Sequence, residues 1–246
     1  MRVFFKVISI LVVLLPIHSC FGPFNPDNPQ MGIVPNDTTK VKTPPSLVAW
    51  WKCDDSTDFI NSASYTGIKG ELQQGISFDT GVGGTGLSLL FNNDTYVSVL
   101  NDSVLNFKNS DFTISLWCKP KKLNDQSILI SKGTTDSTSS FVLALYNGAP
   151  AIFTGTVAHP IEDTIHYDIW NHIAFVRENG GLSIYLNSKR YSVGAESPCL
   201  FNNKTLRIGT TYDSKDYYRG NIDEIKIERK PWSENEIKTE YARFHK

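Results

Sequence analysis

The chain has 246 residues, with 24 Lys plus Arg against 25 Asp plus Glu, and its net charge of −1 provides no cationic field to attract nucleic acid or an anionic membrane. Hydrophobic residues make up 40% of the sequence and charged residues only 20%, which excludes a disordered chain. The length suits one large all-β domain or two small domains.

The N-terminus predicts a secretory leader. Arg2 and Lys6 precede an apolar run over 7–17, which is too short for a helix rising about 1.5 Å per residue to cross a hydrocarbon core of roughly 30 Å. Residues 15–20 read Leu-Pro-Ile-His-Ser-Cys and resemble the lipobox of bacterial lipoproteins, although His18 replaces the usual small residue. The resemblance implies a signal peptide over 1–19 and lipidation of Cys20. An ordinary signal peptide cut nearby, with Cys20 unmodified, is the alternative.

The segment that follows predicts a spacer. Residues 20–45 hold half of the 12 prolines, and proline favours an extended, partly stiff chain. We therefore expect a Pro-rich tether from Cys20 that holds a folded domain away from the lipid, with no other contact with the membrane. The residue after Cys20 is not acidic, and by resemblance to bacterial lipoproteins this implies the outer membrane.

From residue 46 onward, short runs of alternating apolar and polar residues predict β-strands. The clearest run begins at Asp111, and alternation places Phe112, Ile114, Leu116 and Cys118 on one face. Turn signals such as Asn-Gly at 147–148 and 179–180 separate the runs. The pattern predicts two stacked antiparallel sheets in an all-β sandwich. The other predicted strands occupy residues 47–52, 86–91, 95–99, 127–131, 141–146, 151–154, 170–177, 182–187, 205–209 and 222–228.

One helix is expected near the C-terminus. Ser233 provides an N-cap hydroxyl and Glu236 stands three residues later, which is the pattern of a capping box. The sequence predicts a short helix from this point through Tyr241.

Ten of these segments, in their order and spacing, resemble the laminin-G-like, concanavalin A-like lectin/glucanase superfamily. The resemblance covers residues 46–244 and implies one jelly-roll sandwich domain over 46–246. Because this fold carries lectins, enzymes and adhesion modules, it leaves the function open. The segments are LVAWW (47–51), GLSLLF (86–91), YVSV (96–99), FTISLW (112–117), ILISK (128–132), WNHIAFV (170–176), IYLN (184–187), LRIG (206–209), GNIDEI (220–225) and WSENEI (232–237).

The motif that would make the domain a glycosidase is missing. Glucanases of the superfamily carry Glu-x-Asp-x-x-Glu, whose two glutamates act on the glycosidic bond. The nearest segment here runs from Asn221 to Lys226, and these two residues occupy the glutamate positions. We therefore predict no catalytic residues and no enzymatic activity.

Calcium is the ion that the sequence favours. The segment 54–61 is dense in hard oxygen ligands, and alternation with Ile225 and Ile227 predicts that Asp223 points inward, where its charge needs compensation. The family resemblance implies one structural Ca²⁺ held by Asp58, Asn61 and Asp223. The alternative is that Asp223 accepts backbone N–H groups and that the acidic segment is a solvated turn.

Sugar binding calls for exposed aromatic rings with polar side chains beside them. The segment 211–219 is the richest of this kind, and it predicts a ligand site in a loop between two late strands. Segments 92–96 and 166–168 are weaker alternatives, and polar turns with aromatics covering sheet edges are the competing interpretation. The predicted ligand-binding residues are Tyr212, Asp213, Lys215, Asp216, Tyr217 and Tyr218.

Histidine and cysteine offer little chemistry. His172 lies in a predicted strand, and we expect a packed, hydrogen-bonded structural side chain. Cys118 alternates with apolar residues and is expected to be buried, and the sequence allows a disulfide between Cys53 and Cys199.

Together these features predict a lipid-anchored protein of the bacterial envelope that binds glycan without chemistry. The alternative is an adhesion or assembly module that binds a cell-surface protein, and a glycoside hydrolase without the usual motif comes third.

Overall fold

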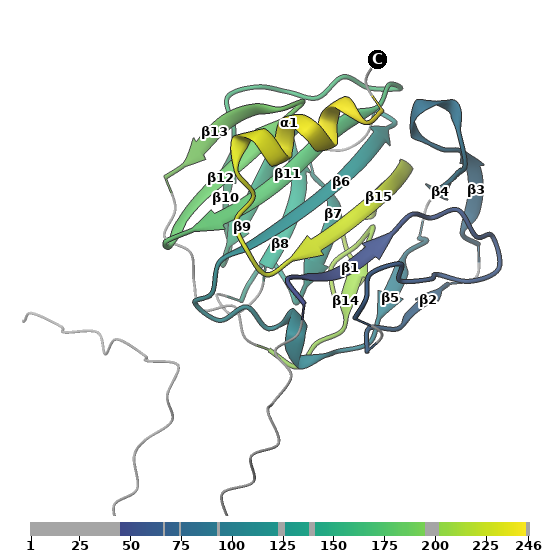
Figure 1. The fold of residues 1–246 in the computed structure, drawn as a ribbon, viewed down its shortest axis with the longest axis horizontal. Coiled ribbons are helices and arrows are strands. Elements are labelled where there is room, and N and C mark those ends of the chain that lie inside the picture. The colour runs from purple at the N-terminus through teal and green to yellow at the C-terminus, as the bar shows by residue number, and fades with distance from the viewer. Residues whose placement is uncertain are drawn as a thin grey trace, which may run out of the picture. The chain divides into compact units, whose positions relative to one another are not determined.

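The computed structural model of the chain describes residues 45–65, 67–73, 75–92, 94–122, 126–137, 141–194 and 202–244. These residues form two stacked antiparallel sheets and one short α-helix (Figure 1), which confirms the predicted all-β sandwich. The predicted signal peptide and nearly all of the predicted tether, Cys20 included, lie outside the described residues.

Sheet A runs in the order β13-β12-β11-β6-β15-β4-β3, and β1 pairs with the second half of β15, beyond the part that pairs with β4. Every pair in it is antiparallel. Its strands are β1 (Leu47–Trp51), β3 (Ser77–Thr80), β4 (Leu87–Phe91), β6 (Phe112–Pro120), β11 (Asn171–Glu178), β12 (Gly181–Leu186), β13 (Lys189–Val193) and β15 (Gly220–Glu228).

Sheet B runs in the order β10-β9-β8-β7-β14-β5-β2 and is also antiparallel throughout. Two short 3₁₀ turns, η1 (Val82–Gly84) and η2 (Ser103–Leu105), lie between strands. The strands of sheet B are β2 (Gly70–Leu72), β5 (Val97–Val99), β7 (Gln126–Lys132), β8 (Phe141–Tyr146), β9 (Ala149–Thr154), β10 (Val157–Pro160) and β14 (Leu206–Ile208).

The hydrophobic core lies between the two sheets and follows the period of two. In β6 the predicted inward residues Phe112, Ile114, Leu116 and Cys118 are all fully buried in this core. Trp117 points to the outer face of sheet A, where it stacks on Tyr241 from the C-terminal helix. One strand therefore contributes to the core with one face and to a second packing layer with the other.

Two predicted hairpin turns are present. Asn147 and Gly148 join β8 to β9, and Asn179 and Gly180 join β11 to β12, all four with positive φ. Such paired left-handed residues match the twist of the flanking strands, which explains why Asn-Gly and similar pairs predict hairpins well.

The C-terminal helix α1 (Glu234–Ala242) packs on the outer face of sheet A, across β11 in Figure 1. Ser233 and Glu236 form the predicted capping box, and Ile237 is fully buried against Ala174 and Val176. Within the described residues, no helix has the length and apolar character needed to span a bilayer.

Candidate functional site

The β14–β15 loop, which carries the predicted ligand-binding residues, is anchored on strand β7 of sheet B. Its backbone is fixed at both ends, because Gly209 N–H donates to Leu129 O (3.0 Å) and Ile128 N–H donates to Asp216 O (2.9 Å). Between them, Tyr212 N–H donates to Gly133 O at 2.9 Å. The loop is therefore held in one conformation, which is the condition for a preformed binding surface.

The acidic residues of this loop are engaged with a neighbouring lysine of the loop and with strand β7. Asp213 forms an ion pair with Lys215 at 2.7 Å, and Asp216 accepts a hydrogen bond from Gln126 at 2.7 Å. Burial alone would raise the pKa of Asp213, but hydrogen bonds from Lys215 and Thr211 lower it below its ordinary value. The pKa of Asp216 is raised, chiefly by burial.

Tyr218 does not belong to the surface of this loop. Its side chain is fully buried, its ring packs edge-on against Phe91, and its hydroxyl donates to Asn221 O at 3.0 Å. A ring inside the core cannot stack on a sugar, so the prediction for Tyr218 is corrected. Tyr212 and Tyr217 are half-buried and keep part of their side chains at the surface.

The structure adds a cationic residue that the sequence interpretation missed. Arg207 in β14 places its guanidinium carbon 4.5 Å from the ring centroid of Tyr96 and 5.2 Å from that of Tyr212. Lys204 lies over Tyr212 at 4.3 Å. We call Tyr96, Lys204, Arg207 and Tyr212 the tyrosine–arginine cluster. The sequence holds one signal for this arginine. Arg207 stands between the apolar Leu206 and Ile208, which are buried in the core, and alternation along a strand places it on the outer face.

The tyrosine–arginine cluster joins two of the predicted segments. Tyr96 belongs to the weaker alternative at 92–96, and Tyr212 to the preferred segment at 211–219. The other alternative, at 166–168, is part of a separate contact in which Asp168 pairs with Lys121 at 2.7 Å.

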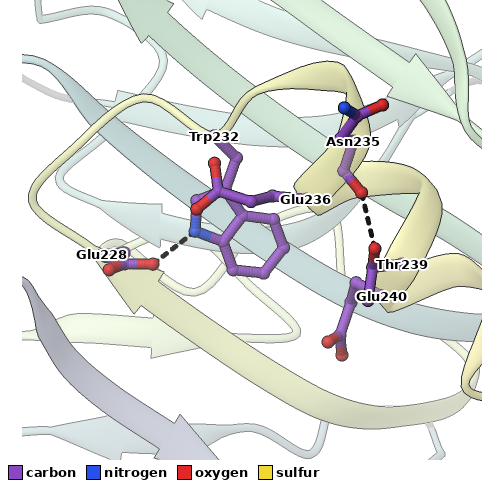
Figure 2. Close-up of a pocket in the computed structure, with 6 residues that line it drawn as sticks. All are labelled: Glu228, Trp232, Asn235, Glu236, Thr239 and Glu240. Atoms are coloured by element: carbon purple, nitrogen blue, oxygen red, sulfur yellow. Dashed lines mark hydrogen bonds between the residues drawn. The ribbon is translucent and has the colours of Figure 1, made fainter.

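A cavity of about 320 Å³ lies on the other side of the sandwich, between the end of β15 and helix α1. Figure 2 shows its lining, with the Trp232 indole donating to Glu228 and Thr239 donating to Asn235. The lining residues are Glu228, Trp232, Asn235, Glu236, Thr239 and Glu240.

The three carboxylates of this cavity are already engaged. Glu236 accepts from Lys230 at 2.5 Å and from the capping residue Ser233, whereas Glu240 is paired with Lys226 at 2.6 Å. Glycoside hydrolysis needs one carboxyl group free to donate a proton and a second free to attack or to activate water. The arrangement serves to hold α1 on sheet A.

The predicted calcium ligands Asp58, Asn61 and Asp223 all accept hydrogen bonds from backbone N–H groups. All four hydrogen-bonding positions of the Asn61 amide are used by backbone, because Oδ1 accepts from Trp50 and Ala63 and Nδ2 donates to Val48 and Tyr65. Asp58 is exposed and accepts from the N–H of Phe59. Among the residues that the structure describes, no group of three or more His, Cys, Asp or Glu side chains is placed to hold a metal ion.

Asp223 lies on the opposite face from the one predicted. Glu224 adopts a left-handed conformation (φ 48°) and forms a bulge in β15, so the alternation shifts by one residue. Asp223 therefore pairs with Trp117 on the outer side, while Ile225 stays in the core. Its two oxygens accept the N–H groups of Val82 (2.9 Å) and Glu224 (2.7 Å). Burial raises the pKa of Asp223 to about 7.

These contacts do not fit a shared calcium site. A smaller cavity of about 170 Å³ beside β1 is lined by Asp54, Asp55 and Asp58, but also by the ammonium-bearing Lys52. The structure thus favours the alternative for Asp223, in which backbone donors satisfy its oxygens.

The thiols and the strand histidine are structural. Cys53 and Cys118 are buried free thiols, and burial raises the pKa of each well above its usual value. His172 is fully buried and bonds Ser115 Oγ at 2.8 Å, as predicted. Cys199, the predicted partner of Cys53, lies outside the described residues.

The sandwich, the topology of its sheets and the outer-face loop define a jelly-roll domain of the lectin-like type. The family model for the concanavalin A-like lectin/glucanases superfamily, Laminin_G_3, matches residues 91–238. The chain belongs to this superfamily. No curated protein matches the sequence significantly.

Several solved structures have a similar fold. One is domain 4 of AbnA, a GH43 extracellular arabinanase from Geobacillus stearothermophilus, solved in complex with arabinotriose. Its TM-score is 0.65 at 21% sequence identity, and the match covers 79% of this chain and 97% of that domain. The binding domain of Paraclostridial Mosquitocidal Protein 1 has a TM-score of 0.60 at 17% identity and covers 81% of this chain.

A structure of botulinum neurotoxin type C, described as entering cells through two ganglioside molecules, has a TM-score of 0.63 at 12% identity and covers 82% of this chain. This chain spans only 52% of each of the two toxin chains. At these identities the likeness establishes the fold.

Proposed function

We propose that the domain is a non-catalytic carbohydrate-binding module that uses the outer face of sheet B around the β14–β15 loop. The observation that carries the proposal is the tyrosine–arginine cluster, in which half-buried tyrosines and fixed polar groups share one surface. Rings with an exposed edge and hydrogen-bonding side chains beside them are what sugar recognition requires.

Two observations support the absence of chemistry. Asn221 and Lys226 stand where glucanases of the superfamily carry glutamates. Glu224, the carboxylate between them, accepts the Trp50 indole N–H at 2.6 Å and lies 3.6 Å from Arg243. Among the solved neighbours, one was solved in complex with arabinotriose and one is a toxin binding domain.

A glycan array tests the proposal. The full chain, purified in mild detergent, is expected to bind at least one glycan family, and Tyr212→Ala is expected to weaken that binding at least tenfold. Tyr185→Phe on sheet A is the matched control and should leave binding unchanged. Silence across plant, host and bacterial glycans would overturn the proposal.

A protein ligand is the second candidate, because one of the similar structures is the binding domain of a mosquitocidal protein. Under this alternative the array stays silent while the same surface captures a protein of the cell envelope. Loss of that capture in Tyr212→Ala would then assign the surface to a protein partner.

We further propose that Cys20 carries a lipid and that residues 20–45 tether the domain to the outer membrane. The observation behind this is the lipobox-like sequence at 15–20. Cells fed a labelled fatty acid should label the chain, and Cys20→Ser should abolish the label while Cys53→Ser keeps it. Equal labelling of Cys20→Ser and the unchanged chain would rule the anchor out.

A further inference from the structure

A row of paired residues crosses all seven described strands of sheet B on its outer face. The pairs run from Glu71 through Ser98, Arg207, Ser131, Val142 and Phe153 to Ala158. Partners in an antiparallel pair share a face, so these side chains are neighbours in one line. Arg207 is the third of these seven residues and stands between two serines. Because serine side chains are small, the arginine has no bulky cross-strand neighbour on either side.

The guanidinium of Arg207 is held in place by groups that carry no charge. Its Nη1 donates to Thr211 O at 3.2 Å and to Ser214 Oγ at 2.6 Å, and its plane lies near the rings of Tyr96 and Tyr212. Its Nε is buried and has no hydrogen-bond partner among the described atoms.

Neither cation of the tyrosine–arginine cluster has a carboxylate within ion-pair distance in the described part of the chain. The ion pairs found there do not include Arg207 or Lys204. The nearby Asp213 is paired with Lys215, and Asp216 accepts from Gln126. Glu71, in the same row, is exposed and lies two strands from Arg207.

The position of Lys204 changes what Tyr212 offers to a ligand. Lys204 and Arg207 both lie over its ring, so a neutral sugar would have to displace a cation to stack there. A ligand with a negative charge would instead gain a charge-assisted hydrogen bond from a guanidinium that is already oriented.

We propose that Arg207 and Lys204 bind the acidic group of an anionic glycan, a carboxylate or a sulfate ester. The inference rests on the proposed glycan binding and names the class of its ligand. The two acidic groups share the same chemistry at this site, because each presents several oxygens to the guanidinium.

The test compares matched acidic and neutral probes by isothermal titration calorimetry with the full chain in mild detergent. One pair is oligogalacturonate against its methyl ester, and the other is a sulfated galactan oligosaccharide against its desulfated form. We expect at least one acidic probe to bind tenfold or more tightly than its neutral partner, with an affinity that falls as salt rises. The pair that shows the preference tells carboxylate from sulfate.

Variants assign the preference to the cluster. Arg207→Gln should reduce the acidic preference to less than twofold, and Lys204→Met, at an exposed position, should reduce it without affecting the fold. Lys238→Met on helix α1, also exposed, is the matched control and should bind like the unchanged chain.

The outcomes separate the two proposals. Equal binding of acidic and neutral probes, or a preference that survives in both Arg207→Gln and Lys204→Met, would overturn the anionic ligand and leave glycan binding in place. Failure of every glycan to bind in the array and in the titrations would overturn both.

Discussion

The side chain of Asn61 joins two segments of backbone. It accepts from the N–H of Trp50 at 2.9 Å and of Ala63 at 3.0 Å, and it donates to Val48 O at 3.1 Å and Tyr65 O at 2.9 Å. An amide can do this because it carries two donors and an acceptor oxygen with two lone pairs. The residue thus fixes the loop after β1 to β1 itself.

We predict that Asn61→Asp destabilises the domain by about 2 to 4 kcal/mol, because the new carboxylate oxygen would face two carbonyl oxygens where the amide donated. Urea unfolding followed by circular dichroism measures the change. A calcium ligand would behave differently, since Asp is the better ligand. Recovery of Asn61→Asp on addition of Ca²⁺ would therefore contradict the role given to Asn61.

The buried His172 is expected to make the free energy of unfolding depend on pH. Burial lowers its pKa to about 4, with nearby Glu240 opposing this change and Lys226 adding to it. Below pH 6.5 the unfolded chain binds a proton that the folded chain does not bind. The contribution of His172 to stability should therefore fall as the pH drops from about 6.5 towards 4, by up to about 1.4 kcal/mol per pH unit. Asp223, whose pKa burial raises to about 7, contributes with the opposite sign over this range, so the effect of His172 is measured as a difference between variants.

Urea unfolding at pH 4.5, 5.5 and 7 measures this dependence. In His172→Gln the slope should be smaller, whereas the exposed His166→Gln should keep the slope of the unchanged chain. An identical slope in His172→Gln would assign the acid sensitivity to other groups.

At the scale of elements, helix α1 depends on a buried ion pair. Lys226 in β15 contacts Glu240 in α1 at 2.6 Å, and each side chain is only 9% exposed. Removing one partner of such a pair leaves a charge that is buried and uncompensated.

We predict that Glu240→Gln lowers the free energy of unfolding by about 3 kcal/mol. Glu234→Gln is the matched control on the same helix, because its ion pair with Lys238 is exposed and should contribute less than about 0.5 kcal/mol. Equal effects of the two substitutions would mean that the Lys226–Glu240 contact does not hold the helix.

The strands that could be predicted are those with a clear period of two. β8 was predicted with its observed ends, and β6 was predicted over all but its last two residues. β2, β3, β10 and β13 were missed, because they are short, largely exposed strands at or near sheet edges, where few positions are apolar. Length and alternation make a strand visible in a sequence, and these edge strands offer little of either.

The position of Asp223 could not be predicted, because alternation assumes an unbroken strand. The bulge at Glu224 adds one residue to β15 and reverses which side its neighbours face. A positive φ at a glutamate has no sequence signal of its own.

The candidate site was predicted only in part, for a reason that belongs to the whole molecule. Tyr96 comes directly before β5, Arg207 from β14 and Tyr212 from the β14–β15 loop, and the pairing of β14 with β5 brings them together. The sequence indicates which segments are rich in aromatic and polar residues, but not which strands are neighbours. Tyr218 illustrates the same point, since its ring packs in the core against Phe91 of β4, which is distant in the sequence.

The two buried thiols report on opening of the whole domain. Cys53 and Cys118 belong to the core, and burial raises the pKa of both thiols. In a chain with Cys20→Ser and Cys199→Ser, we predict that a thiol reagent labels them with the same urea midpoint as the loss of circular dichroism.

Mass spectrometry measures this labelling, and Ser64→Cys provides an exposed position that should react without urea. Labelling of Cys53 or Cys118 well below the unfolding midpoint would contradict a single cooperative core.

The row across sheet B also has an evolutionary consequence. In β14 the inward Leu206 and Ile208 determine the fold, while Arg207 between them faces outward. Substitutions at Ser98 and Arg207 can therefore change what the surface recognises while leaving the contacts of Leu206 and Ile208 as they were. Such a separation lets one scaffold acquire new ligands by mutation, and it makes these two positions the natural choice for a library selected for new specificities.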